Sequence, residues 1–308
     1  MEPSRTPSVS RRTVLTGAVA GTLAALVPIS TAAAAPNYSV IPLLAGETRR
    51  DDTHVTANGT AYEAIDVSIQ GDLARLFIPH SVLPRLSTGV PVVWFYHANG
   101  SRYTALSSAF QWPAERLVEL GAVCICPDYG GASAWTSSIA IRAQKNAIAY
   151  VNGLGRVSVS LLRANSGGGS LMTLAYGNRW LPAQRGMYLA SATYDMEDLA
   201  IRDRARFEPV YAPDLAAAGG DLWALAPQNA ARLPQSAWTG ARIRVAAATN
   251  DLVVPADKHG LALIARANPV AAEVSSRTFV TPAGVGVNGH YVPDWVNGDM
   301  ITTFQSWL

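Results

Sequence analysis

Residues 163–177 read RANSGGGSLMTLAYG, and they decide how the rest of this 308-residue chain is interpreted. The residues before Ser166 form an apolar, β-rich run, whereas those from Gly168 onward have the spacing of a helix. A serine at a strand-to-helix corner is exposed on a sharp turn, where a nucleophilic hydroxyl is needed. The alternative is that Ser166 caps the helix and the glycines only allow a tight turn.

Residues 164–168, Ala-Asn-Ser-Gly-Gly, match most of the Gly-x-Ser-x-Gly pattern of a nucleophile elbow. Ala164 replaces the first glycine and adds only a methyl group at a tight strand–helix contact. Gly168 keeps the second glycine, at the point where the helix must start close to the strand. Ser170 is a poorer candidate, because Met172 stands where its second glycine should be.

Strands and helices are predicted to alternate along most of the chain. Turn residues at 70–72 separate the first two strands, which we expect to form a hairpin. The predicted strands are residues 62–69, 73–80, 91–97, 122–128, 157–165, 186–192, 242–249 and 276–282. The predicted helices are residues 107–121, 138–153, 255–268 and 294–308, together with one that begins near Gly168. This alternation indicates an α/β fold with a mostly parallel central sheet and helices on both faces.

Residues 194–238 interrupt this alternation. They are rich in alanine, proline and charged residues and contain no recognisable strand. We expect an insertion over the edge of the sheet, either a cap that shapes substrate access or a packing excursion without that role. Residues 35–308 are otherwise expected to form a single catalytic domain, since no repeat or low-complexity tract divides them.

Two further polar residues follow the serine in the order that its catalytic partners would take. Asp251 comes directly after the predicted strand at 242–249, and His290 lies in the loop before the last helix. Because the carboxyl ends of parallel strands meet at one edge of a sheet, these side chains are expected near Ser166. Asp251 has a competing interpretation as a helix cap, and Asp195, just after another strand, is the rival acid.

The elbow, this chain order and the Asp-x-x-Val-Pro sequence that starts at Asp251 together resemble the α/β-hydrolase superfamily, over about residues 60–308. The resemblance implies that Ser166 is the nucleophile and that His290 accepts its proton and returns it to the leaving group. It also implies that Asp251 holds the imidazole in the required tautomer and stabilises the imidazolium.

The same resemblance implies an oxyanion hole made of backbone N–H groups. One donor is expected at Gly167, at the start of the helix. The second is expected in residues 97–101, HANGS, which are similar to the His-Gly-x-x segment of esterases but carry Ala98 in place of glycine. Asn99 is the expected donor in this loop, and Gly100 is the alternative.

Aromatic residues near the predicted strand ends are candidates for a substrate pocket. Packing in the core is the competing interpretation for each of them. The residues considered are Tyr103, Tyr129, Trp135, Tyr194 and Trp223, of which Tyr129, Trp135 and Tyr194 are the primary candidates.

The beginning of the chain resembles an export signal. Residues 10–15, SRRTVL, form a twin-arginine pattern, an apolar run rich in glycine and alanine reaches Ile29, and TAAAAP follows at 31–36. The apolar run is shorter than the roughly 20 residues of a transmembrane helix, and glycines interrupt it. We therefore expect the twin-arginine export machinery to secrete the protein and residues 1–34 to be removed, with the cut after Ala34.

The remaining chain has equal numbers of basic and acidic residues, and its only lysines are Lys145 and Lys258. Since no basic run is left, the charge pattern gives no support for a nucleic-acid partner. Cys124 and Cys126 lie two apart on one predicted strand and are expected to be buried free thiols. No cluster of Cys or His accompanies them, so we expect no metal site there.

The sequence thus predicts a secreted serine hydrolase that cleaves carboxylic esters of small or polymeric substrates through an acyl-enzyme, without cofactor or metal. A serine peptidase or an acyltransferase on the same fold is the alternative among enzymes. A non-catalytic binding protein of this fold would be marked by the loss of Ser166, Asp251 or His290, and all three are present.

Overall fold

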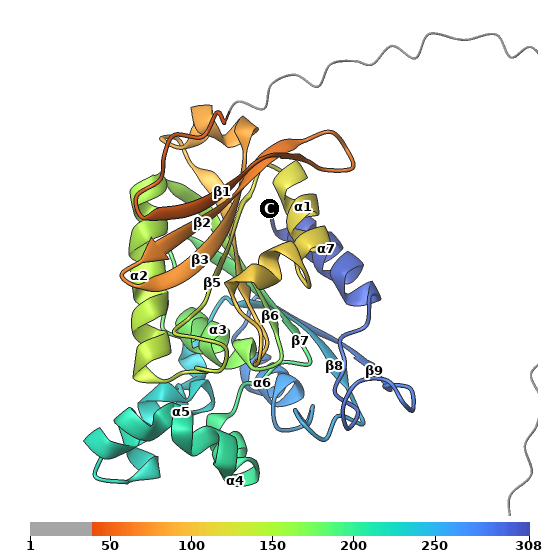
Figure 1. Ribbon diagram of the computed structural model, residues 1–308. Coiled ribbons are helices and arrows are strands. Elements are labelled where there is room, and N and C mark those ends of the chain that lie inside the picture. Colours follow the sequence, from red (N-terminus) through yellow and green to blue (C-terminus); the bar gives the residue numbers. More distant parts are fainter. Residues whose placement is uncertain (1–38) are drawn as a thin grey trace, which may run out of the picture. The chain divides into compact units, whose positions relative to one another are not determined.

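The computed structural model describes residues 39–308; residues 1–38, with the expected signal sequence 1–34, lie outside the described part. In the described part, nine strands form one sheet in the order β1-β2-β3-β5-β4-β6-β7-β8-β9 (Figure 1). Their bounds are β1 Glu47–Val55, β2 Ala61–Ile69, β3 Asp72–Pro79, β4 Val90–Tyr96, β5 Val123–Pro127, β6 Val157–Asn165, β7 Gln184–Ala190, β8 Arg242–Ala248 and β9 Glu273–Phe279. β1, β2 and β3 pair antiparallel, β3 pairs antiparallel with β5, and all pairs from β5 to β9 are parallel.

Helices cover both faces of this sheet, and Figure 1 shows α1 and α7 on one side with α2, α3 and α6 on the other. The helix bounds are α1 Gln111–Glu119, α2 Ser138–Leu154, α3 Gly168–Gly177, α4 Met196–Arg202, α5 Arg204–Ala217, α6 Gly260–Ala267 and α7 Trp295–Trp307. Each face buries its own apolar cluster, with Leu171 of α3 in one and Phe304 of α7 in the other. The expected mostly parallel α/β sheet is therefore confirmed. Within residues 39–308, no helix combines the length and the apolar character of a membrane span.

β1 is the one strand that the sequence pattern did not predict. Its sequence, ETRRDDTHV, is charged and lacks an apolar face, because β1 lies at the edge of the sheet and pairs only with β2. A polar network holds it instead. Arg50 of β1 is ion-paired with Glu47 at 2.5 Å and with Glu63 of β2 at 2.6 Å. Glu63 is fully buried and also accepts hydrogen bonds from the backbone N–H groups of Val40 and Ile41.

Residues 194–238 form the predicted insertion, made of α4, α5 and three short 3-10 helices. These 3-10 helices are Leu222–Gln228, Ala230–Arg232 and Gln235–Trp238. The insertion has its own apolar cluster, in which Phe207 and Tyr211 stack at 4.1 Å between ring centroids and Trp135 packs beside them. We call residues 194–238 the cap, since Figure 1 shows α4 and α5 beyond the end of the sheet at which β6 runs into α3.

The two cysteines lie on β5, both fully buried and unbonded to each other. Burial raises the pKa of the Cys124 thiol well above its usual range. Both residues belong to the apolar cluster on the α1 and α7 face. They contribute packing rather than chemistry in this fold.

Candidate active site

Ser166 stands at the tight turn between β6 and α3, with a φ of +48°. A positive φ is strained for a residue other than glycine, and it persists only where the surroundings fix it. The backbone around Ser166 is fixed by β7, the loop after β7 and the first turn of α3. The Ser166 N–H donates to the carbonyl of Ala190 at 3.2 Å, and the Ser166 carbonyl accepts from Thr193 N–H at 2.9 Å and from Gly169 N–H at 3.1 Å.

The glycine after this turn is required by the close approach of α3 to β4. A Cβ at Gly168 would lie 2.5 Å from the carbonyl oxygen of Tyr96 and 2.6 Å from that of His97. Ala164, where the elbow pattern has glycine, is fully buried in the apolar cluster of the α2 and α3 face. Its methyl group is accommodated there, so the departure from the pattern leaves the turn intact.

Ser166, His290 and Asp251 form one hydrogen-bonded line. Nε2 of His290 lies 2.9 Å from Oγ of Ser166, and Nδ1 lies 2.7 Å from Oδ2 of Asp251. A carboxylate only accepts hydrogen bonds, so Nδ1 carries the proton and Nε2 is left to accept from the serine hydroxyl. Asp251 is itself buried, and its other oxygen accepts from the N–H groups of Val253 at 2.8 Å and Val254 at 2.7 Å.

The loop after β4 faces the same serine. His97 anchors it, with Nδ1 3.0 Å from the Ala98 carbonyl and Nε2 3.1 Å from the Asp128 carbonyl. Gly100 N–H donates to the carbonyl of Ala132 at 2.8 Å, so it is not free to bind an oxyanion. Within residues 39–308, no such backbone partner engages the N–H groups of Asn99 and Gly167.

A cavity of about 580 Å³ opens in front of Ser166 and His290. Its wall is mainly apolar, and Arg206 of the cap brings a cation to it. Other residues that line the cavity include Asn99, Trp135, Asn165, Leu199, Val253, Val254, Val287 and Val292. Of the expected pocket aromatics, only Trp135 lies in this wall.

The expectation for Tyr129 and Tyr194 as pocket residues was wrong. Tyr129 is buried behind the loop after β4, stacks on Tyr96 at 4.8 Å between centroids and donates to the Phe95 carbonyl at 3.1 Å. Tyr194 is buried edge-on against Trp238, at 6.1 Å between centroids. Both rings serve packing. The secondary candidates Tyr103 and Trp223 also lie outside the wall of the cavity.

Neither a protein-family model nor a curated protein sequence matches this chain. Solved structures match it by shape. An S-formylglutathione hydrolase from Agrobacterium tumefaciens aligns over 85% of this chain and 98% of its own, with 14% identity and a TM-score of 0.60. Together with the strand order and the elbow, this likeness decides the fold. The chain has the α/β-hydrolase fold.

Two further solved structures share this fold with the chain. An acetyl xylan esterase from Paenibacillus sp. R4 aligns over 84% of this chain and 89% of its own, with 13% identity and a TM-score of 0.57. Esterase B from Lactobacillus rhamnosis, inhibited by a tributyrin phosphonate, aligns over 82% and 87%, with 17% identity and a TM-score of 0.56. At these identities the likeness establishes the α/β-hydrolase fold and no more.

In this α/β-hydrolase fold the rival acid Asp195 has another task. Its carboxylate caps α4 by accepting from Glu197 N–H at 2.9 Å, and it also accepts from Asn229 Nδ2 at 2.8 Å. The carboxylate that lies against His290 is that of Asp251.

The sequence analysis did not predict the side chains that hold the loop around His290, which we call the histidine loop. Ser191, next to the end of β7, donates to the carbonyl of Tyr291 at 2.7 Å. Thr281 donates to the carbonyl of Gly289 at 2.6 Å. A Cβ at Gly289 would lie 2.0 Å from the Asn250 carbonyl oxygen, so the histidine loop passes close to the acid loop. The only sequence signal for Ser191 is a small polar residue directly after an apolar strand.

Arg163, beneath the elbow, was also missed as a structural feature. It is fully buried on β6, and its Nη1 donates to the Ala164 carbonyl at 2.8 Å. Its guanidinium carbon lies 5.0 Å from the centroid of the Tyr188 ring. Burial lowers the pKa of Arg163 to about 10. The signal was present in the sequence as the one charged residue of this strand.

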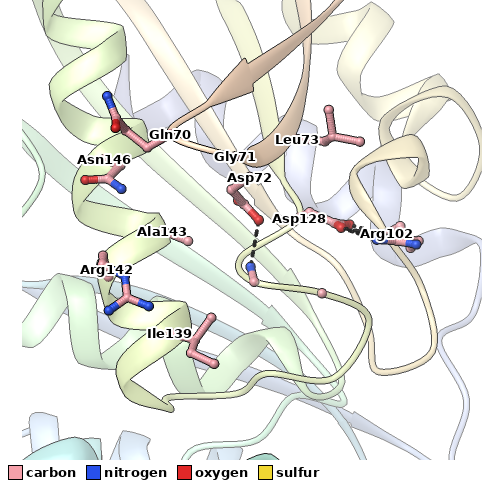
Figure 2. Close-up of a pocket in the computed structure, with 12 residues that line it drawn as sticks. Gln70, Gly71, Asp72, Leu73, Arg102, Asp128, Ile139, Arg142, Ala143 and Asn146 are labelled. Atoms are coloured by element: carbon pink, nitrogen blue, oxygen red, sulfur yellow. Dashed lines mark hydrogen bonds and ion pairs between the residues drawn. The ribbon is translucent and has the colours of Figure 1, made fainter.

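A second cleft, of about 380 Å³, lies among the turn between β2 and β3, the loop after β5 and α2 (Figure 2). Figure 2 shows Asp72 reaching the backbone of the loop after β5 and Asp128 paired with Arg102, at 2.7 Å. Asp72 accepts from the N–H groups of Tyr129 at 3.0 Å and Gly130 at 2.9 Å. Burial raises the pKa of Asp72, and these hydrogen bonds oppose that rise. Ser166, Asp251 and His290 do not line this cleft, and its carboxylates fix the loop that supports Gly100.

Proposed function

We propose that this chain is a serine hydrolase that cleaves carboxylic esters through an acyl-enzyme. The observation that carries the proposal is the continuous line from Asp251 through His290 to Ser166, with the serine on a strained turn in front of a cavity. The esterases among the structural neighbours support it, because they have the same fold.

The arrangement fits the chemistry of acyl transfer. Oγ of Ser166 bonds to the ester carbonyl carbon while its proton moves to Nε2 of His290, and the carbonyl π electrons move to the oxygen. On collapse the bond to the leaving alkoxide breaks, and the proton on Nε2 passes to that alkoxide. Water then attacks the acyl carbon while its proton moves to Nε2 of His290. The bond to Oγ of Ser166 breaks, Oγ takes the proton from Nε2, and the carboxylic acid is released. Asp251 keeps the imidazole aligned and stabilises the imidazolium in both halves.

The backbone N–H groups of Gly167 and Asn99 are proposed as the oxyanion donors. Gly167 N–H lies at the start of α3, where helix N–H groups lack partners within the helix. Asn99 N–H lies in the loop held by His97 and by the hydrogen bond of Gly100 to Ala132. Donors in a preorganised loop stabilise the oxyanion without a reorganisation cost at the moment of reaction.

The test compares the wild type with Ser166→Ala on p-nitrophenyl acetate and butyrate. Wild type should show a burst of p-nitrophenol equal to the enzyme concentration, followed by steady turnover, and Ser166→Ala should lose about 10⁴-fold or more in kcat. Ser170→Ala is the matched control, since the Ser170 hydroxyl donates to the carbonyl of Gly167, the N-cap of α3, and Ser170 does not line the cavity. Equal slow hydrolysis by wild type and Ser166→Ala would instead indicate a binding protein.

We also propose that the twin-arginine export machinery secretes the protein. The proposal rests on the pattern at residues 10–15 and on the small residues before Pro36. Expression of the full chain in a bacterium with this machinery, followed by N-terminal sequencing of protein from the medium, tests it. The expected new terminus is Ala35, and Arg11→Lys with Arg12→Lys should keep the precursor inside the cell.

A further inference from the structure

The side chain of Asn99 occupies the space that a side chain at position 167 would take. A Cβ built on Gly167 would lie 2.2 Å from Oδ1 of Asn99, 2.5 Å from Cγ and 3.0 Å from Nδ2. Real Cβ atoms do not come this close to other atoms, so the carboxamide fits there only because residue 167 is glycine. Asn99, Gly167 and Ser166 all line the same cavity.

This carboxamide is unpaired although the loop that carries it is held firmly. Asn99 is partly buried, and within residues 39–308 neither Oδ1 nor Nδ2 has a hydrogen-bond partner in the protein; both atoms remain accessible to solvent. The backbone on both sides is fixed, since Ser101 N–H donates to the Ala98 carbonyl at 3.0 Å and Gly100 N–H donates to Ala132. The terminal torsion of an asparagine is broad, so the amide can turn Nδ2 toward an acceptor without moving the backbone.

The position next to Gly167 is where negative charge develops in the proposed reaction. Gly167 offers its backbone N–H to the oxyanion, and the Asn99 carboxamide lies directly against Gly167. A primary amide carries two N–H donors, and a buried or partly buried unpaired donor gains most from an anionic acceptor. The ground-state ester carbonyl is a weaker acceptor, so the contact favours the tetrahedral intermediate.

We propose that the Asn99 side chain, in addition to any backbone donor, stabilises the oxyanion through Nδ2, and that Gly167 lacks a side chain to make room for it. The inference rests on the proposed function, because it assumes attack by Ser166 on a carbonyl. It assigns two separate roles to Gly167, a backbone donor and the absence of a Cβ. It also makes Asn99 a catalytic residue through its side-chain atom Nδ2, in addition to its backbone N–H.

The first test measures kcat/KM for p-nitrophenyl butyrate in wild type, Asn99→Ala and Asn99→Asp. Alanine keeps the backbone N–H and removes only the amide, so kcat/KM should fall about 10²–10³-fold, mostly in kcat. Aspartate has the shape of asparagine but no donor when ionised, and its charge opposes the oxyanion, so its loss should exceed that of alanine. If the amide only packs, Asn99→Asp preserves the shape and loses less than Asn99→Ala, which overturns the proposal.

The second test is a double-mutant cycle with Gly167→Ala. The added methyl keeps the backbone N–H of residue 167 but must displace the Asn99 carboxamide. Gly167→Ala should therefore impair wild type strongly and impair Asn99→Ala little, since the displaced group is already absent. Additive losses would overturn the assignment of the glycine. Thermal unfolding of each variant shows whether the chain still folds.

A trifluoromethyl ketone that forms a tetrahedral adduct with serine hydroxyls separates catalysis from structure. Its inhibition constant should increase in Asn99→Ala by the factor by which kcat/KM falls, because both quantities depend on the charged tetrahedral state. An unchanged inhibition constant contradicts the proposal. Failure of the proposed function is distinct, since wild type would then show neither a burst nor dependence on Ser166.

Discussion

The loops at the carboxyl ends of the strands and the cap both reach the same cavity, but different interactions stabilise each of them. At the strand ends, Asp251 is buried and both oxygens of its carboxylate have hydrogen-bond partners. The backbone of Ser166 is fixed by three hydrogen bonds. The cap carries exposed ion pairs on its helices, such as Arg204 with Glu208 at 2.6 Å. Pairs of this kind contribute about 0–1 kcal/mol each.

A small group of polar contacts, around His259, Asp198 and Arg202, joins the cap to the loop that follows Asp251. Nδ1 of the buried His259 accepts from the N–H groups of Tyr194 and Asp195, each at 3.1 Å. Its Nε2 lies 3.1 Å from Oδ2 of Asp198, and Arg202 donates to the Leu252 carbonyl at 3.2 Å. The difference teaches that the groups of the proposed chemistry are held by the sheet, whereas the cap contributes only Leu199 and Arg206 to the cavity wall and can be weakened without moving Ser166, His290 or Asp251.

The largest effect that separates the two regions is expected from a pair of acid substitutions. Asp251→Asn should lower kcat about 10⁴-fold, because the amide favours the wrong imidazole tautomer and no longer stabilises the imidazolium. Asp195→Asn keeps an oxygen that can accept from Glu197 N–H and cap α4, so both kcat and stability should change little. Steady-state hydrolysis of p-nitrophenyl butyrate checks both. A greater loss of kcat in Asp195→Asn than in Asp251→Asn would show that Asp195, and not Asp251, is the acid partner of His290.

An intermediate effect is expected from adding a methyl group at the elbow. Gly168→Ala forces a Cβ to within 2.5 Å of the Tyr96 carbonyl oxygen and should lower the free energy of unfolding by about 1–3 kcal/mol. Gly153→Ala in α2 is the matched control, because its Cβ would meet nothing within 4 Å. The control should be neutral or stabilising by up to about 1 kcal/mol. Urea unfolding measures both, and equal free energies would contradict the close approach of α3 to β4.

The smallest effect is a pH dependence at the junction of the cap. Burial alone would raise the pKa of Asp198, but hydrogen bonds from His259 and Arg202 outweigh it and hold that pKa well below its usual range. A depressed carboxylate pKa stabilises the fold above the unfolded value, and this contribution is lost as the pH falls through the folded value. Wild type should therefore be more stable than Asp198→Asn at neutral pH.

Unfolding followed by circular dichroism checks this dependence. The difference between the two proteins should shrink as the pH is lowered below about 4, the ordinary range of an aspartate. Hydrolysis of a short ester at neutral pH should be nearly the same in both. A constant difference across this pH range would show that the Asp198 contacts do not depend on its charge.

The sequence predicted the sheet and the meeting of Ser166, His290 and Asp251, because these signals are local or ordered along the chain. Apolar strands such as β4 and β6 are recognisable from composition alone, and the elbow needs only the residues around Ser166. β1 escaped because an edge strand held by ion pairs has no apolar period. α5 escaped because Pro209 and Pro213 interrupt it and its apolar residues follow no single face.

The direction of side chains at strand ends could not be predicted in the same way. Tyr129 and Tyr194 follow strands, as pocket residues often do, yet both rings turn into the core. The role of Gly167 was predicted only in part. Its backbone N–H followed from the elbow pattern, but its contact with Asn99 joins two loops distant in sequence and depends on tertiary structure.

The central claim, that Ser166 is a nucleophile activated by His290, is tested most directly by covalent labelling. The purified protein is treated with a p-nitrophenyl alkylphosphonate, and the labelled peptide is located by mass spectrometry. The predicted result is one phosphonyl group per chain, attached to Ser166, with complete loss of esterase activity and almost no labelling of His290→Ala. A label on Ser170 or another residue, or full activity in a chain labelled at Ser166, would contradict the claim.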